Sequence, residues 1–422
     1  MSVIGITAEF NPFHNGHLSL MQAIGAQKRA DSFVCVMSGD FVQRGAPAIC
    51  DKYSRTGQAL FSGIDAVFEL PAVYACSSAE RFALGSVALL SSLGVVDYIA
   101  FGSECGDLDA LMLVASILAE EPDEYRLSLH SYLKHGLTFP AAREAALCAY
   151  AVSHDIGRDI LAEYPGLLSS PNNILAVEYC KASVILKRKG IKVPELLTVR
   201  RTSPYQKDTP ESAHDASATA IRRILTESGS GISPVEPFVP AAVYEELSSG
   251  FCRTYPVLPD DFSSILYSRL LSVANMSDTH AYAQTKDIPP DMLNAILKSI
   301  NTPITVSSLI SSVKSKNYTY SAVSRALVSI MLELPVRPAR ELTEAGIAPY
   351  ARLLGFRKAS SQLIKRINET CHCEIINKLS DAKTASPLLE SDVRAARLYD
   401  QIVFEKFGVK LADEYKAGVV IC

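Results

Sequence analysis

The first half of the chain alternates short apolar runs with longer segments that suit helices. The runs are continuous and too short for helices, which favours strands buried on both faces of a sheet. They cover residues 3–8, 32–37, 66–70, 98–101 and 195–199. Between them, apolar residues recur with helical spacing, as at Leu18, Met21 and Ile24. Strands that alternate with helices through short connections predict an α/β fold with a doubly wound parallel sheet.

One apolar stretch, residues 82–102, is long enough to resemble a membrane span. Leu93-Gly94 divides it, and Asp97 interrupts its second half. A helix over 79–92 followed by a buried strand over 98–101 accounts for it better. We therefore expect no membrane-spanning segment.

The rest of the chain is predominantly helical in pattern. Residues 106–165 are rich in leucine and alanine and predict a helical insertion. Residues 228–240, SGSGISPVEPFVP, are rich in Gly, Ser and Pro and predict a linker. Beyond it, helices are expected at 244–249, 262–273, 290–298, 306–312 and 320–334. The sequence thus predicts a catalytic domain over 1–228, which carries the insertion, and a mostly α-helical domain over 241–422.

Charge and cysteine content indicate which partners, which cellular compartment and which metal sites to expect. The formal net charge of the 422 residues is −4, so the protein lacks the overall positive charge that is typical of nucleic-acid-binding proteins. Any RNA binding must therefore come from local basic patches. The ten cysteines show no CxxC spacing, and no signal peptide precedes the first strand, which predicts reduced thiols in the cytoplasm. Cys371-His372-Cys373 lacks a second ligand pair, so we expect no metal site there.

Basic and aromatic residues interleave between positions 314 and 366. Such a patch can bind phosphodiester backbone and stack bases, although solvated helix faces would show the same pattern. If the patch binds RNA, we expect Arg352, Arg357 and Lys358 to be among its contacts.

The candidate chemistry centres on the stretch after the first strand. Asn11-Pro12-Phe13 ends that strand, and His14-Asn15-Gly16-His17 opens the helix. In open α/β sheets, ligands lie at this carboxyl end of the strands. A helix N-terminus attracts anions, and two imidazoles there can donate hydrogen bonds to phosphate oxygens. The alternative to a phosphate-binding site is a purely structural helix-capping turn, in which the two histidines have no role in ligand binding.

Polar side chains also follow the later strands. Arg44 lies in the loop after strand 32–37 and suits a phosphate or a carboxylate, or an ordinary surface turn. Arg200 and Arg201 directly follow strand 195–199 and suit a triphosphate, or a salt bridge to a neighbouring loop. Asn172 and Ser217 belong to helix starts, at PNNIL and SATAIR, where they suit caps or ligand contacts.

Several stretches together resemble one family, the bacterial tRNA(Met) cytidine acetate ligases of the HxGH nucleotidyltransferase superfamily. They are GITAEFNPFHNGH, MSGDFVQRGAPA, GIDAVFELP with FGSE, PNNILAVEY, SATAIR and APYARLLGF. The resemblance implies that ATP and acetate form acetyl adenylate and pyrophosphate. From the chemistry of phosphoryl transfer, we expect Mg²⁺ to bridge the β- and γ-phosphates. The resemblance also implies transfer of the acetyl group to N4 of the wobble cytidine of elongator tRNA(Met), giving N4-acetylcytidine.

From the residues themselves, we expect His14, His17 and the arginines, Arg44 among them, to stabilise charge on the phosphates. Asp40 is a candidate for handling the proton of the cytidine amine, because it follows a strand on the ligand side. The resemblance implies that ATP is bound by Thr7, Ala8, Glu9, Phe10, Asn11, Pro12, Phe13, His14, Asn15, Gly16, His17, Leu18, Ser19, Leu20, Gly102, Asn172 and Arg200. The SATAIR pattern, which resembles the second signature of the superfamily, adds Ser217 and Thr219. Asn173 and Arg201 stay open as alternatives to their neighbours Asn172 and Arg200. Two other functions stay open: a small-molecule adenylyltransferase, and a nucleotide-binding protein without turnover.

Overall fold

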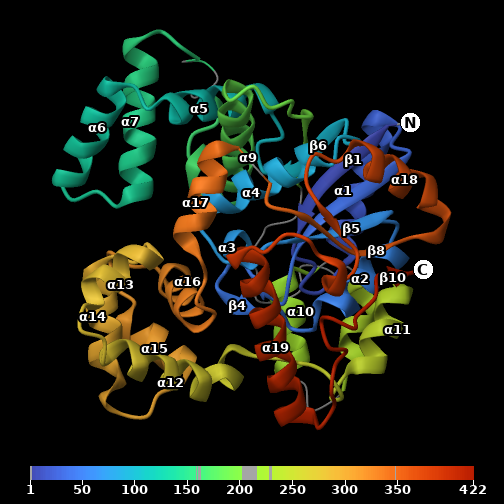
Figure 1. Ribbon diagram of the computed structural model, residues 1–422. Helices are drawn as coiled ribbons and strands as arrows, with labels where there is room; N and C mark the ends of the chain where they lie inside the picture. The colour runs from blue at the N-terminus through green and yellow to red at the C-terminus, as the bar shows by residue number, and fades with distance from the viewer. Residues whose placement is uncertain (1, 158, 160–162, 202–215, 228–230, 347) are drawn as a thin grey trace.

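A computed structural model describes residues 2–157, 159, 163–201, 216–227, 231–346 and 348–422 (Figure 1). Its main sheet has the order β10-β8-β5-β2-β1-β6-β7, with β9 paired to β8. The strands are β1 (Val3–Ala8), β2 (Ser32–Ser38), β5 (Ala66–Leu70), β6 (Tyr98–Ser103), β7 (Glu195–Arg200), β8 (Ala351–Phe356), β9 (Ile375–Ile376) and β10 (Val420–Ile421). The five strands from the first half are parallel, and their order reverses at β1. The predicted doubly wound sheet is confirmed.

Two apolar clusters cover the two faces of this sheet, because successive residues of a strand point to opposite sides. Ile4, Ile6 and Val67 belong to the cluster that includes residues of α1 (Asn15–Lys28), α2 (Lys52–Phe61), α10 (Ala218–Glu227) and α11 (Ala241–Gly250). Val34 and Phe68 belong to the other cluster, with α3 (Ala72–Ala75), α4 (Ala79–Ser92) and α9 (Pro171–Arg188). Between the two faces, the carboxyl ends of β1 and β6 form the crevice expected of the topology.

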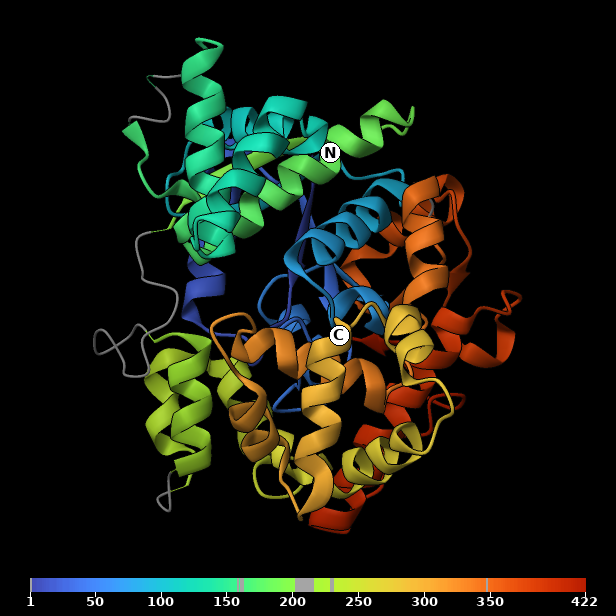
Figure 2. The same cartoon turned by 90° about the vertical axis from the view of Figure 1, so that its left-hand side faces the viewer.

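The insertion is helical, as its composition predicts. Its helices are α5 (Leu108–Glu120), α6 (Asp123–Lys134) and α7 (Phe139–Ser153). Helix α5 packs on α9, whereas α6 and α7 pair with each other at the periphery (Figures 1 and 2). Residues 158 and 160–162 of the predicted insertion lie outside the described part of the chain.

The C-terminal half is mostly helical, also as predicted. It contains α12 (Ser263–Ala274), α13 (Thr279–Lys286), α14 (Pro290–Lys298), α15 (Val306–Val313), α16 (Tyr320–Met331), α17 (Val336–Ala345), α18 (Ser361–Thr370) and α19 (Pro387–Phe407). The predicted linker begins at residues 228–230, which are not described, and continues in a 3-10 helix at Ser233–Phe238. The division into two domains stays a prediction.

Strand β8 is the feature that the sequence pattern did not predict. It pairs antiparallel with β5, so the C-terminal half completes the sheet at the edge that β5 would otherwise leave open. The APYARLLGF motif supplies this strand, and its apolar residues Ala351, Leu353 and Leu354 are buried. Arg352 interrupts the apolar run, which hides the strand from a reading of hydropathy alone.

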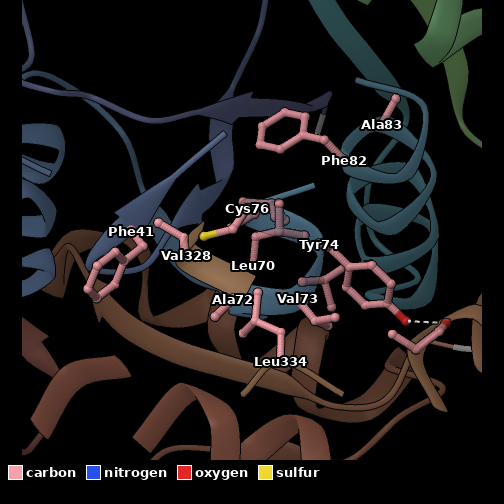
Figure 3. Packing of buried hydrophobic residues seen from close by; sticks show 14 of the residues in the cluster. Phe41, Leu70, Ala72, Val73, Tyr74, Cys76, Phe82, Ala83, Val328 and Leu334 are labelled. Atoms are coloured by element: carbon pink, nitrogen blue, oxygen red, sulfur yellow. Dashed lines mark hydrogen bonds between the residues drawn. The ribbon is translucent and has the colours of Figure 1, made fainter. Parts of the chain in front are cut away.

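The two halves of the chain also share apolar packing (Figure 3). Val328 of α16 lies in the same cluster as Phe41, and the Tyr74 hydroxyl donates to the Ala339 carbonyl at 3.2 Å.

The long apolar stretch over residues 82–102 forms most of α4 and most of β6, as predicted, and not one continuous span. Among the described residues, no helix combines the length and apolar character needed to cross a membrane.

Candidate active site

A pocket of about 720 Å³ opens at the carboxyl ends of β1, β6 and β7. The segment from β1 into α1 forms one wall, and the starts of α9 and α10 form others. Four arginines are among the described residues that line it: Arg44, Arg200, Arg201 and Arg222. Glu9 is the sole acidic residue among its described lining residues. A pocket with this excess of guanidinium groups is suited to a polyanion such as a triphosphate.

The two histidines of the HNGH motif hold each other in place. The His14 backbone N–H donates to Nδ1 of His17 at 3.2 Å, and the Gly16 N–H donates to Nδ1 of His14 at 3.1 Å. This reciprocal pattern is a capping box at the start of α1. Their ring centroids lie 3.9 Å apart, and Phe10 meets the His17 ring edge-on at 5.0 Å. The capping alternative is therefore real, but these hydrogen bonds use only the Nδ1 atoms, and both histidines line the pocket.

Both imidazoles are neutral at physiological pH. Burial, followed by the charges of Arg201 and Arg222, lowers the pKa of His14 to about 3. Burial, His14 and Arg201 lower the pKa of His17 well below its ordinary value. Because each Nδ1 accepts a hydrogen bond, the proton of each neutral ring lies on Nε2. The site thus presents two neutral N–H donors to a ligand at the N-terminus of α1.

Asn172 and Arg201 form a second wall of the pocket. Their contacts distinguish each of them from its neighbour in sequence as a candidate ligand contact. The Arg201 guanidinium donates to Oδ1 of Asn172 at 2.9 Å. Asn173 instead turns its Oδ1 to the backbone N–H groups of Glu104 and Cys105. The geometry therefore favours Asn172 over Asn173 as the ligand contact. Arg200 also lines the pocket, but it is exposed at the end of β7.

Gly102 matters because of Arg201. A Cβ atom at this position would lie 2.7 Å from both Cγ and Cδ of Arg201. Only glycine therefore leaves room for the arginine to lie across the end of β6. The glycine predicted to contact ATP thus also positions a guanidinium group.

We predict that Arg201→Ala weakens ATP binding by about tenfold to a hundredfold, the usual effect of losing a charged hydrogen-bond donor. Arg200→Ala should have a smaller effect because its side chain is exposed. Gly102→Ala should resemble Arg201→Ala, since the added methyl group displaces the guanidinium. Calorimetry with a nonhydrolysable ATP analogue measures all three. Equal losses for Arg200→Ala and Arg201→Ala would contradict the distinction.

The SATAIR motif joins α10 to the HNGH loop. The Ser217 hydroxyl accepts from the Ala220 N–H at 3.2 Å and caps the helix. Arg222 donates to the Asn11 carbonyl at 2.7 Å and to the Thr219 hydroxyl at 3.2 Å. Arg222 was absent from the expected ATP contacts, although its place in the motif could have indicated it.

Most of the predicted ATP-binding residues line this pocket. They are Thr7, Ala8, Glu9, Phe10, Asn11, His14, Asn15, Gly16, His17, Ser19, Leu20, Gly102, Asn172, Arg200, Ser217 and Thr219. Pro12, Phe13 and Leu18 do not line it; Phe13 is fully buried beneath the loop, where Gln58 accepts from its backbone N–H. Sequence reasoning missed the aromatic residues Phe82, Phe101 and Tyr179, which look like ordinary core positions.

Asp40 is not among the described residues that line the pocket, so a role for it in handling a substrate proton stays a prediction that this placement does not favour. Its Oδ1 accepts from the Lys52 backbone N–H at 2.8 Å, and the side chain is buried. Burial, only partly offset by Lys52, raises its pKa to about 7. The loop after β2 turns Asp40 toward Lys52 and brings Arg44 to the pocket instead.

The predicted RNA contacts are not one surface. Arg352 is only 4% exposed and pairs with Glu69 and Glu414, so it cannot meet RNA, and that prediction is wrong. Arg357 and Lys358 are accessible, but they follow β8, which runs against the parallel strands. They therefore lie at the end of the sheet opposite the pocket. A role for these two in RNA binding stays a prediction.

No group of three or more metal-ligating side chains occurs among the residues that the structure describes. In the Cys371-His372-Cys373 cluster the two sulfur atoms lie 3.7 Å apart without a disulfide bond. Among the described residues that line the pocket, Glu9 is the one carboxylate, and its Oε1 already accepts from the Gln43 N–H at 2.9 Å. These residues do not form a dedicated cage for a metal ion.

Comparisons with known proteins agree with this geometry. The model of the HIGH Nucleotidyl Transferase family matches residues 1–414. A tRNA(Met) cytidine acetate ligase from Thermoanaerobacter sp. (strain X514) is 38% identical over 403 residues, which cover 94% of this chain and 95% of that protein. One from Clostridium perfringens (strain SM101 / Type A) is 36% identical over 423 residues and covers 100% of both chains.

Solved structures of Thermotoga maritima TmcAL share the whole fold at 27% identity. The apo crystal structure has a TM-score of 0.87, with 100% of this chain and 99% of that chain covered. A second crystal structure, bound with alpha-thio ATP, has a TM-score of 0.84 and the same coverage.

Proposed function

Because the chain belongs to the HIGH nucleotidyltransferase family and, within it, to the tRNA(Met) cytidine acetate ligases, we propose that it uses ATP to acetylate N4 of the wobble cytidine of elongator tRNA(Met). The observation that carries the proposal is the pocket in which two neutral imidazoles face Arg201 and Arg222. We expect the reaction in the cytoplasm, where tRNA is the substrate and where the ten unpaired thiols stay reduced.

The first half-reaction joins acetate to ATP. A carboxylate oxygen of acetate attacks the α-phosphorus, an O–P bond forms, and the bond to the β-phosphate breaks. Pyrophosphate leaves with the electron pair, and acetyl adenylate remains. No side-chain nucleophile is needed, since the carboxylate itself attacks. Nε2–H of His14 and of His17 would donate to the phosphate oxygens as charge spreads over them, and Arg201 would hold the anion in place.

Mg²⁺ would enter with the nucleotide, because its ligands would be phosphate oxygens and water rather than a protein cage. When bound, it supplies further neutralisation of the β- and γ-phosphates. The charged and imidazole side chains in the described lining of the pocket are arginines, two histidines and Glu9, which supports a metal held mainly by the substrate.

The second half-reaction forms the amide. N4 of the cytidine attacks the acetyl carbon, the new C–N bond forms, and the C–O bond to AMP breaks. The amine must also lose a proton. Glu9 is placed for this step, because it is the acidic residue among the described pocket lining and its Oε1 is oriented by the Gln43 N–H. The base must be extruded to reach this depth, as an anticodon loop allows.

We predict that Glu9→Gln lowers acetylation of tRNA by about a hundredfold while acetate-dependent pyrophosphate release without tRNA stays near wild type. Removal of a general base typically costs this much. Glutamine keeps an oxygen that can accept from Gln43, so the loop should remain in place. Single-turnover transfer from preformed acetyl adenylate isolates the step. Unchanged transfer would show that another group takes the proton.

The function itself is tested by pyrophosphate release with acetate, with and without elongator tRNA(Met), together with detection of N4-acetylcytidine. A small-molecule adenylyltransferase would release pyrophosphate without modifying the tRNA. A nucleotide-binding protein without turnover would bind ATP and release none. Either result would refute the proposal.

A further inference from the structure

On the basis of the proposed function, we propose that the acetate methyl group binds in an aromatic pit formed by Phe82, Phe101 and Tyr179, and that Arg44 binds the acetate carboxylate. All four residues line the same pocket as the HNGH motif. The aromatic pit is an acyl-selecting site, and its size limits which carboxylic acids are activated.

The pit lies across the sheet edge from the imidazoles. Phe101 projects to the α4 and α9 face of β6, whereas its neighbours Ala100 and Gly102 face the nucleotide wall. Tyr179 lies two turns along α9 from Asn172, on the same face of that helix. In the proposed arrangement, the α-phosphate would lie between the two walls, because the attacking carboxylate must reach it from the side of the rings.

Arg44 and Phe82 are fixed to the same part of the pocket. The Gln43 side-chain amide donates to the Ser77 carbonyl at 3.2 Å, directly before α4, from which Phe82 projects. The Gln43 backbone is held by Glu9. Arg44 follows Gln43 directly and lines the same pocket as the three rings. Its guanidinium can pair with a carboxylate in two parallel hydrogen bonds.

The rings suit a methyl group and not a nucleobase. Phe82, Phe101 and Tyr179 are 3%, 6% and 3% exposed, so only their edges reach the cavity. Phe101 and Tyr179 also stack on each other, with centroids 5.3 Å apart and an interplanar angle of 29°. A base needs an exposed ring face to stack upon, whereas these three rings are almost fully buried, and Phe101 and Tyr179 cover one face of each other. Figure 3 shows Phe82 next to Ala83 among the residues of this cluster.

Acyl-chain selectivity tests the proposal. Wild type should prefer acetate over propionate by about tenfold to two-hundredfold in kcat/KM for pyrophosphate release, the usual effect of one methylene in a closed apolar site. Phe82→Leu should raise the propionate-to-acetate ratio by about tenfold and leave the KM for ATP within about twofold. Leu175→Ala, at a less buried part of the same wall, should act in the same direction. Arg44→Gln should raise the KM for both acids without changing their ratio.

Phe68→Leu is the matched control, because Phe68 is equally buried in β5 but does not line the pocket. It should leave the ratio unchanged. Folded Phe82→Leu and Leu175→Ala variants with the wild-type ratio, or with a parallel loss of ATP affinity, would overturn the proposal. Calorimetry with nonreactive acetyl and propionyl sulfamoyl adenosines measures the acyl preference of the pit without turnover. Equal affinities of the wild-type protein for the two compounds would also overturn the proposal. Absence of acetate-dependent pyrophosphate release in wild type is a different result, which refutes the proposed function.

Discussion

Replacing His17 by alanine should lower acetate-dependent pyrophosphate release by about a hundredfold or more, the usual cost of losing one donor to a developing oxyanion. The neutral ring carries its proton on Nε2, because Nδ1 accepts from the His14 N–H at 3.2 Å. The substitution therefore removes both a donor to the phosphate and a helix cap. The cap alone should cost about 1 kcal/mol of stability. Steady-state release of pyrophosphate and urea unfolding measure the two effects.

The His17→Asn variant distinguishes the loss of the phosphate donor from the loss of the helix cap. Its side-chain oxygen can accept from the His14 N–H, yet it places no donor where Nε2 stands. It should keep most of the stability and lose the activity. His154→Ala serves as a control, since His154 lies at the end of α7, outside the pocket. Near-normal pyrophosphate release by His17→Asn would show that His17 only caps the helix.

Replacing Arg352 by alanine should destabilise the protein by about 3–5 kcal/mol, the usual effect of removing one partner from a buried ion cluster. Arg352 contacts Glu69 at 3.1 Å and also pairs with Glu414. Lys52 lies 2.9 Å from Glu69 and 3.0 Å from Glu414. Without Arg352, two buried carboxylates would share one ammonium group. Urea unfolding measures the loss.

Arg357→Ala is the control for this prediction. Its guanidinium lies 3.7 Å from Asp65 and its side chain is 42% exposed, so it should cost less than about 1 kcal/mol. If Arg352 instead contacted RNA, its substitution would weaken tRNA binding and leave stability unchanged.

The same cluster predicts a response to acid. Burial would raise the pKa of Glu414, but Lys52 and Arg352 outweigh it and lower that pKa in the folded protein. The folded state therefore holds this proton less tightly than the unfolded chain. The stabilisation is complete above the unfolded pKa of about 4.3 and is lost as the pH falls through the folded value. Arg352→Ala should weaken this part of the acid dependence.

The cluster also explains how a distant part of the chain shapes the pocket. Lys52 forms an ion pair with Glu414 of the C-terminal segment. It also lies beside Asp40, which belongs to the loop that carries Arg44. The Ser324 hydroxyl of α16 donates to the Gly45 carbonyl at 2.7 Å, and the Tyr399 hydroxyl of α19 donates to the Ala48 carbonyl at 2.9 Å. The C-terminal helices thus position one wall of the site, whether or not they contact RNA.

The sequence by itself determined the five parallel strands, the position of α4 and β6, and the HNGH turn, because each depends on local periodicity or on a turn made by neighbouring residues. Tertiary structure decided what depends on partners far along the chain. It joined β8 to β5, buried Arg352 among carboxylates, and turned Asp40 toward the Lys52 backbone. It also separated Asn172 from Asn173, since adjacent residues with the same side chain differ only in what the fold places opposite them.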